Sequence, residues 1–217
     1  MEPELVERSL RSCGGTLAAA RAALRDGAAA YLAGGTHHAR ADRGAGYCVF
    51  NDCAAAARVV QREGGIERVL IVDTDVHQGD GTAAIFAGDD SVFTFSIHGA
   101  QNFPAEKAIS DLDVALPTGT GDDDYLRALT AGLGEALERC RPQFVFLLSG
   151  ADPFAGDRLG TLALTKDGLA QRDRLVLDAT RGRGVPAVTV MGGGYGRVIE
   201  DTVDVYEVTV RAAVTQG

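Results

Sequence analysis

The sequence lacks a continuous run of about 18 apolar residues, the length that a helix needs to cross a bilayer. Its first ten residues, MEPELVERSL, contain neither a basic nor an apolar segment, so they do not resemble a secretory signal peptide. No two cysteines have the CxxC spacing, and the four cysteines are scattered along the chain. These absences predict a cytoplasmic protein with reduced thiols and no membrane segment.

An excess of positive charge is also missing. The chain has 21 lysines and arginines against 30 aspartates and glutamates, which gives a formal net charge of −9. Because a nucleic-acid surface needs a basic face, we expect no direct contact with nucleic acid. Apolar residues, by contrast, make up 46% of the 217 residues. That content is enough for one large domain with a sizeable core, and we expect residues 1–217 to form it.

Apolar runs of strand length recur along the chain. They cover residues 28–33, 68–73, 91–97, 143–148 and 185–191. Since these runs are continuous rather than alternating, they indicate strands that are covered on both faces, as in a parallel sheet between helices. Helical patterns separate them, at residues 16–27, 54–65, 122–140 and 165–184. The sequence therefore predicts a three-layer α/β/α fold with a mainly parallel sheet.

The C-terminal segment, residues 197–214, is ambiguous. Its β-branched residues favour a strand, but its apolar residues recur at helical spacing, and we favour a helix.

Clusters of polar residues follow the predicted strands. Their sequences are GGTHHA, DTDVHQGD, HGAQNFP, SGADPFAGD and GGGYG. All four histidines of the chain fall in these clusters. Open α/β sheets bind their ligands at the carboxyl ends of the strands, so we expect the clusters to form one active site there.

Asp75 and His77 predict a metal site. They are two positions apart, so in an extended chain their side chains lie on the same side. A carboxylate oxygen and an imidazole nitrogen suit a divalent ion such as Zn²⁺, and a catalytic zinc needs a third protein ligand. Asp152 is the natural candidate, with Asp157 as the rival. The alternative for the pair alone is a capping aspartate and a loop histidine.

The adjacent residues His37 and His38 predict acid–base chemistry. Neighbouring side chains do not easily bind one ion, but both can line one cleft as general base and general acid. Each would need a carboxylate on its other ring nitrogen. Asp73 and Asp80 remain for this purpose once Asp75 binds the metal.

Tyr195 lies in the glycine-rich segment GGGYG. Glycines allow the backbone to approach a ligand closely, and a phenol beside a metal can donate a hydrogen bond to a developing oxyanion. The segment lacks the spacing and the lysine of a P-loop. The alternative for Tyr195 is an aromatic residue that only packs.

Together, the segments GGTHHA, GYCVFND, DTDVHQGDG, SGADPFAGDRLG and GGGY resemble the zinc-dependent histone deacetylase and acetylpolyamine amidohydrolase superfamily. The segments DVHQGDG, NFP and SDLDVALP are most similar to its bacterial members near class IV. The resemblance runs from about Gly14 to Tyr195. It implies the arginase/deacetylase fold, one Zn²⁺ per chain and hydrolysis of an acyl-lysine or acetylpolyamine amide.

The resemblance also implies roles for individual residues. The implied zinc ligands are Asp75, His77 and Asp152, and the implied catalytic residues are His37, His38, Tyr195, Asp73 and Asp80. The implied substrate-binding residues are Tyr47, Leu159 and Gly193. A structural monovalent cation, K⁺, would be held by Asp73, Asp75, His77, Ser96 and Ile97. His98 matches a position that we expect to be structural.

One departure from the family concerns the N-terminus. Members usually have a further strand and rim loops before the helix that we expect near Thr16. Either this chain is an abbreviated member, or its start is misplaced, or a partner covers the gap; an exposed flank there would favour homo-oligomers. The alternative functions are a catalytically silent binding module and, less favoured, a ureohydrolase with two Mn²⁺ ions.

Overall fold

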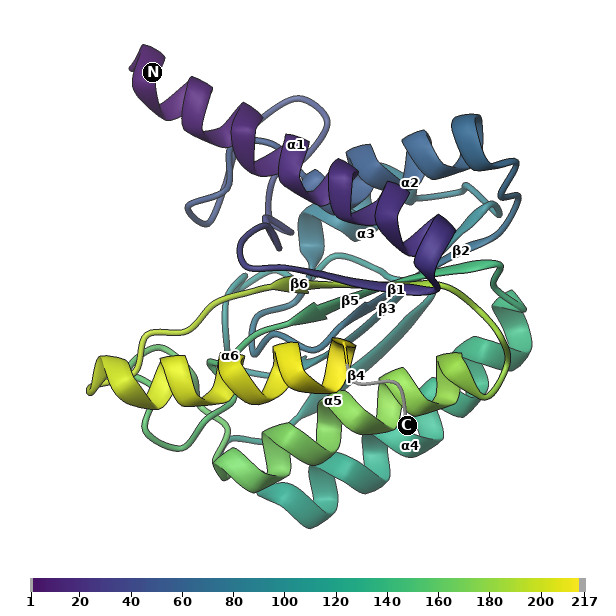
Figure 1. Ribbon diagram of the computed structural model, residues 1–217. Helices are drawn as coiled ribbons and strands as arrows, with labels where there is room; N and C mark the ends of the chain where they lie inside the picture. The colour runs from purple at the N-terminus through teal and green to yellow at the C-terminus, as the bar shows by residue number, and fades with distance from the viewer. Residues whose placement is uncertain (1, 215–217) are drawn as a thin grey trace.

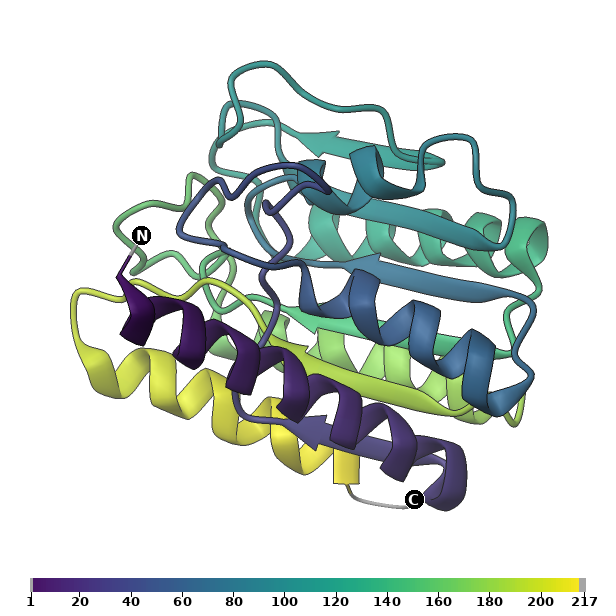
Figure 2. The same cartoon turned by 90° about the horizontal axis from the view of Figure 1, so that it is seen from above.

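The computed structural model describes residues 2–214, and these form a six-stranded parallel sheet between two layers of helices (Figures 1 and 2). The strands are β1 (Ala28–Tyr31), β2 (Val69–Asp73), β3 (Val92–Gly99), β4 (Leu112–Leu116), β5 (Phe144–Ser149) and β6 (Ala187–Met191). The helices are α1 (Pro3–Asp26), α2 (Asp52–Gly64), α3 (Asp80–Phe86), α4 (Asp122–Cys140), α5 (Lys166–Arg181) and α6 (Ile199–Val214). The three-layer fold predicted from the sequence is confirmed.

The strand order is β1-β6-β5-β2-β3-β4, and every neighbouring pair is parallel. Helices α1, α2 and α3 cover one face of the sheet, and α4, α5 and α6 cover the other (Figure 1). Every residue of β2, β5 and β6 is buried. This explains why their sequences are continuously apolar.

The two faces of the sheet carry separate hydrophobic cores. Leu70 and Val72 of β2 pack with residues of α4 and α5, whereas Val69 and Ile71 pack with residues of α1 and α2. Each fully buried aliphatic side chain of this size contributes about 1.5–3 kcal/mol. Both cores hold the sheet rigidly, which fixes the positions of the strand ends.

Helix α1 differs from the prediction, because it begins at Pro3 rather than near Thr16. Thr16 is buried within the helix, and its hydroxyl donates a hydrogen bond to Asp52 instead of capping. The helix continues through Gly15, where a Cβ would lie 2.1 Å from the ring of Tyr31. Glycine at this position therefore serves close packing. The C-terminal segment is helical as favoured, in α6.

Two elements were not predicted. β4 is an edge strand of five residues, in which partly buried and exposed residues alternate up to the buried Leu116, and its apolar run, Val114–Leu116, is too short to predict a strand. α3 has only seven residues and begins at Asp80, inside a segment that the sequence analysis interprets only as a polar cluster.

β1 forms the opposite edge of the sheet, and the nearby Leu32 is 71% exposed. Across residues 2–214, none of the helices has both the length and the apolar content required to cross a bilayer.

Candidate active site

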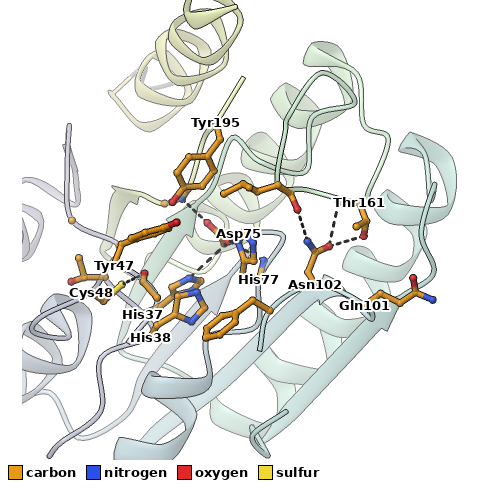
Figure 3. Close-up of a pocket in the computed structure, with 18 residues that line it drawn as sticks. His37, His38, Tyr47, Cys48, Asp75, His77, Gln101, Asn102, Thr161 and Tyr195 are labelled. Atoms are coloured by element: carbon orange, nitrogen blue, oxygen red, sulfur yellow. Dashed lines mark hydrogen bonds and ion pairs between the residues drawn. The ribbon is translucent and has the colours of Figure 1, made fainter. Parts of the chain in front are cut away.

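A cavity of about 580 Å³ lies at the carboxyl ends of the strands. Its lining comes from the loops that follow β1, β2, β3, β5 and β6. Four of the five predicted polar clusters contribute residues to it, and the loop after β5 contributes Leu159 and Thr161, which lie just beyond the cluster SGADPFAGD. In Figure 3 the rings of His37, His38 and His77 lie together in the cavity, and Tyr47 and Tyr195 face them from the other side. The two tandem histidines are buried, whereas Tyr47 is 86% exposed at the mouth.

Asp75, His77 and Asp152 converge on one point. The ligand atoms of these three residues all lie within 4.8 Å of one another. His77 Nδ1 is 2.9 Å from Asp75 Oδ1 and 3.2 Å from Asp152 Oδ2. Asp152 Oδ2 is buried and receives no hydrogen bond within residues 2–214. Two carboxylates and one imidazole are thus directed at the same point, and one carboxylate oxygen there has no hydrogen-bond donor. This set of groups fits a divalent ion such as Zn²⁺.

The neighbouring glycines let the backbone close around this group. A Cβ at Gly193 would lie 2.0 Å from Asp152 Oδ2. The Gly193 amide instead donates to Asp75 Oδ2 at 2.6 Å, which orients that carboxylate. The glycine-rich segment therefore supports the candidate metal ligands directly.

The candidate metal centre has a strong negative field. Burial alone would lower the pKa of His77, but the carboxylates of Asp152 and Asp75 outweigh burial and raise it to about 10. Burial and the charge of Asp75 raise the pKa of Asp152 to about 7. Burial would also raise the pKa of Asp75, but His37 and His77 hold it below its ordinary value. These shifts are the ones expected where two buried carboxylates face one imidazole, and they indicate a negative potential at this point.

Each tandem histidine has its own carboxylate partner. His37 Nδ1 lies 2.6 Å from Asp73 Oδ2, and His38 Nδ1 lies 2.7 Å from Asp80 Oδ1. The second oxygen of Asp80 binds Arg40 Nη2 at 3.0 Å. The pairing predicted from the sequence is therefore present in the structure, and both other ring nitrogens remain available for chemistry.

The two histidines differ in their affinity for protons. Burial would lower the pKa of His37, but Asp73 and Asp75 raise it to about 9. Burial and the neighbouring charge of His37 lower the pKa of His38 below its ordinary value. His37 Nε2 is 3.9 Å from Asp75 Oδ1, so His37 is beside the candidate metal centre.

Tyr195 lines the cavity on a loop that Asp157 anchors. Asp157 Oδ2 accepts a hydrogen bond from the Tyr195 amide at 2.6 Å, and its Oδ1 accepts from Leu159 and Gly160. The structure thus places Asp157 outside the candidate metal group, as the resemblance implied. Burial and the charges of Asp75 and Asp152 raise the pKa of Tyr195 above its ordinary value, so the phenol keeps its proton as a donor.

The other residues implied by the resemblance lie at or near the cavity. Tyr47, Leu159 and Gly193 all line it. Tyr47 and Tyr195 have ring centroids 6.4 Å apart. Ser96 of β3 is paired in register with Asp73 of β2, and the other residues predicted to hold K⁺ are Ile97 of β3 and Asp75 and His77 in the loop after β2. His98 is buried beside Ser96, with 3.0 Å between Nδ1 and Oγ.

One wall of the cavity contains residues to which the sequence analysis gave no individual role. Phe103 packs edge-on against His38 at 4.8 Å between ring centroids. Asn102 connects this wall to the opposite one, since its Nδ2 donates to the Leu159 carbonyl and its Oδ1 accepts from Thr161. Both residues belong to the cluster HGAQNFP, which the sequence analysis placed at the active site because it follows a strand, without giving a role to either residue.

The profile of the histone deacetylase domain matches residues 1–211. An uncharacterized protein of Picosynechococcus is 49% identical over 209 residues, which are 96% of this chain and 70% of that protein. Histone deacetylase 2 of Arabidopsis thaliana is 33% identical over 89% of this chain. The crystal structure of an acetylpolyamine aminohydrolase from Burkholderia pseudomallei superposes with a TM-score of 0.79 at 29% identity over 93% of this chain.

The chain spans only part of these longer relatives. It covers 52% of the Arabidopsis protein and 60% of the Burkholderia chain. The profile match nevertheless extends over nearly all of the sequence, and the same region carries the fold and the cavity. The chain belongs to the histone deacetylase family.

Proposed function

We propose that this protein is a zinc-dependent amidohydrolase that removes acetyl or other acyl groups from lysine side chains or from polyamines. One observation supports this most: Asp75, His77 and Asp152 converge beside two histidines that each have a carboxylate partner. Relatives are named for both substrate types, as a histone deacetylase and as an acetylpolyamine aminohydrolase.

The proposed metal ligands are Asp75, His77 and Asp152. When bound there, Zn²⁺ supplies Lewis acidity toward the amide carbonyl and lowers the pKa of a water molecule. Ser96 and Ile97, together with Asp73, Asp75 and His77, are proposed to hold a structural K⁺.

The tandem histidines are proposed to move the protons. His37 Nε2, which lies on the Asp75 side of the cavity, accepts a proton from the attacking water, and Asp73 holds its ring in place. His38 donates a proton to the departing amine, and Asp80 orients it. A Zn²⁺ ion bound by Asp75 would oppose the rise in the pKa of His37 that the Asp75 carboxylate causes. This would favour the function of His37 as a base.

Tyr195 is proposed to donate a hydrogen bond to the carbonyl oxygen as negative charge develops on it. Tyr47, Leu159 and Gly193 are proposed to bind the substrate, because they line the same cavity. The buried position of the histidines and the exposed Tyr47 suit a substrate with a narrow acylated end and a larger carrier.

The test is a panel of acetyl-lysine peptides, longer acyl-lysine peptides and acetylated polyamines, assayed with zinc and with a chelator. We expect turnover of at least one class, and loss of turnover with the chelator. If the zinc-loaded protein hydrolyses none of these amides, the proposal is wrong and a catalytically silent binding module is favoured.

A further inference from the structure

The turn that carries His37 and His38 is held by two side chains at the start of α2. Asp52 is fully buried. Its Oδ2 accepts a hydrogen bond from the Gly35 amide at 3.1 Å, and its Oδ1 accepts one from the Thr36 amide at 2.8 Å. The Thr36 hydroxyl lies 2.7 Å from the same Oδ1 and 2.6 Å from the Phe50 carbonyl oxygen, so both oxygens are within reach of its proton. These contacts hold the two residues directly before the histidines.

Asn51 holds the same turn from the other side. Its Nδ2 donates to the Ala39 carbonyl at 3.2 Å and to Thr82 Oγ1 at 2.9 Å, and lies 3.4 Å from the His37 carbonyl. The Thr82 amide also donates to the His37 carbonyl, at 3.0 Å. The backbone on both sides of the histidine pair is therefore bound by side chains or by the start of α3.

Helix capping does not account for these contacts. Asn51 caps α2 with Oδ1 alone, through the Ala54 amide, and this leaves Nδ2 for the turn. The carboxylate of Asp52 instead binds the turn and the hydroxyl of Thr16 in α1. A buried carboxylate costs several kcal/mol unless hydrogen-bond donors compensate it, so a charge at this position needs these contacts.

We infer that Asn51 and Asp52 are positioning residues for the His37–His38 pair. The inference rests on the proposed function, in which these histidines transfer protons. Proton transfer needs donor and acceptor atoms within about 2.6–3.2 Å, and a displacement of about 1 Å can cost about 100-fold in rate. Fixing the turn also fixes the histidine rings against Asp73 and Asp80.

The variant that tests this is Asp52→Asn, which keeps the size of the side chain but can present an NH₂ group to the Gly35 or Thr36 amide. We expect kcat to fall by about 10- to 100-fold, with KM changed far less and zinc retained. The matched control is Thr16→Val, which removes a donor to the same carboxylate and leaves the carboxylate's hydrogen bonds to the Gly35 and Thr36 amides in place. We expect this control to keep its kcat within about twofold, since its effect falls on folding stability.

Two further measurements do not depend on activity. In the metal-free protein, amide hydrogen exchange at Gly35 and Thr36 should accelerate in Asp52→Asn and remain slow in Thr16→Val. The downfield imidazole N–H proton resonances of His37 and His38 in NMR spectra should shift or broaden only in Asp52→Asn.

Distinct outcomes separate the two ideas. Wild-type kcat or unshifted imidazole resonances in Asp52→Asn overturn the positioning inference while leaving the proposed function intact. If the wild type hydrolyses no acyl substrate, the proposed function fails, and the exchange rates and resonances still decide the positioning. If Asp52→Asn does not fold, Thr36→Val and Thr36→Ser replace it: kcat should fall with valine and recover with serine, and equal rates overturn the inference.

Discussion

His77 Nδ1 lies 3.2 Å from Asp152 Oδ2, although the two residues follow different strands, β2 and β5. The parallel pairing of these strands brings their carboxyl ends together, with Asp73 in register with Leu148. The sequence can reveal each ligand, but the sheet places them at one point. This convergence is the basis for the metal prediction.

The first prediction is that the purified protein binds about one zinc ion per chain through Asp75, His77 and Asp152. His77→Ala should abolish stoichiometric binding, because it removes the only nitrogen ligand of the group. Elemental analysis after dialysis measures the zinc content. His98→Asn is the control, since His98 lies outside the group, and it should keep its zinc. Equal zinc in the wild type and in His77→Ala would contradict the assignment.

The second prediction concerns Tyr195. Tyr195→Phe should keep its fold and its zinc but lose about 10²–10³ in kcat, which is the usual effect of removing one donor to an oxyanion. KM should change far less, because the hydrogen bond acts mainly in the transition state. Steady-state kinetics on a confirmed substrate measures both. A near wild-type kcat would show that Tyr195 only packs in the cavity wall.

The sequence predicted the fold through its continuous apolar runs. Residues 68–73, 143–148 and 185–191 correspond to β2, β5 and β6, which are buried on both faces. The edge strand β4 was not predicted because it has only five residues, and Asp113 leaves an apolar run of just three, Val114–Leu116. The start of α1 was misplaced because Gly14 and Gly15 weaken a helical pattern, and the contact of Gly15 with Tyr31 lies in tertiary structure.

The candidate site was predictable because its residue types are rare and grouped. Four histidines at strand ends indicate chemistry, whereas Asn51 and Asp52 have a sufficient local explanation as the start of a helix. Their contacts with the histidine turn depend on how α2 packs beside that turn. Phe103 was missed for a similar reason, because one aromatic residue in a loop has no pattern of its own.

The third prediction concerns pH and the thiol of Cys48, which lines the cavity. Burial is the main cause that raises the pKa of this thiol to about 12; backbone hydrogen bonds at His38 and Ala39 oppose it, and the charges of Asp52 and Asp75 add to it. The thiolate is the reactive form, so raising the pKa lowers its population at every pH below 12. We expect alkylation of Cys48 by iodoacetamide at pH 8.5 to be about 10³-fold slower than that of a free cysteine, whose pKa is about 8.5.

Mass spectrometry of the proteolytic peptides after timed labelling checks this prediction. All four cysteines should be labelled in denaturant, and Cys48 should remain unlabelled in the native protein. Rapid native labelling of Cys48 near neutral pH would show a stabilised thiolate, and would favour cysteine chemistry in the cavity.

Arg172 is the largest fully buried side chain among the described residues. Its Nε donates to Asp173 Oδ1 at 2.8 Å, and its Nη1 donates to the carbonyls of Gly150 at 2.6 Å and Thr74 at 3.2 Å. Thr74 directly precedes the candidate ligand Asp75. The guanidinium therefore binds both chain segments that lead into the metal group.

The last prediction follows from this buried ion pair. Arg172→Met should lower the free energy of unfolding by about 3–5 kcal/mol, because it leaves the carboxylate of Asp173 buried without its partner. Urea denaturation measures the change. Arg127→Met is the matched control: Arg127 pairs with Asp124 at an exposed site, and its loss should cost less than about 1 kcal/mol. The double variant with Asp173→Leu should recover part of the loss, since it removes the unpaired charge as well. If Arg172→Met costs no more than Arg127→Met, the ion pair does not stabilise the fold, and the carbonyls of Gly150 and Thr74 are held by the surrounding backbone alone.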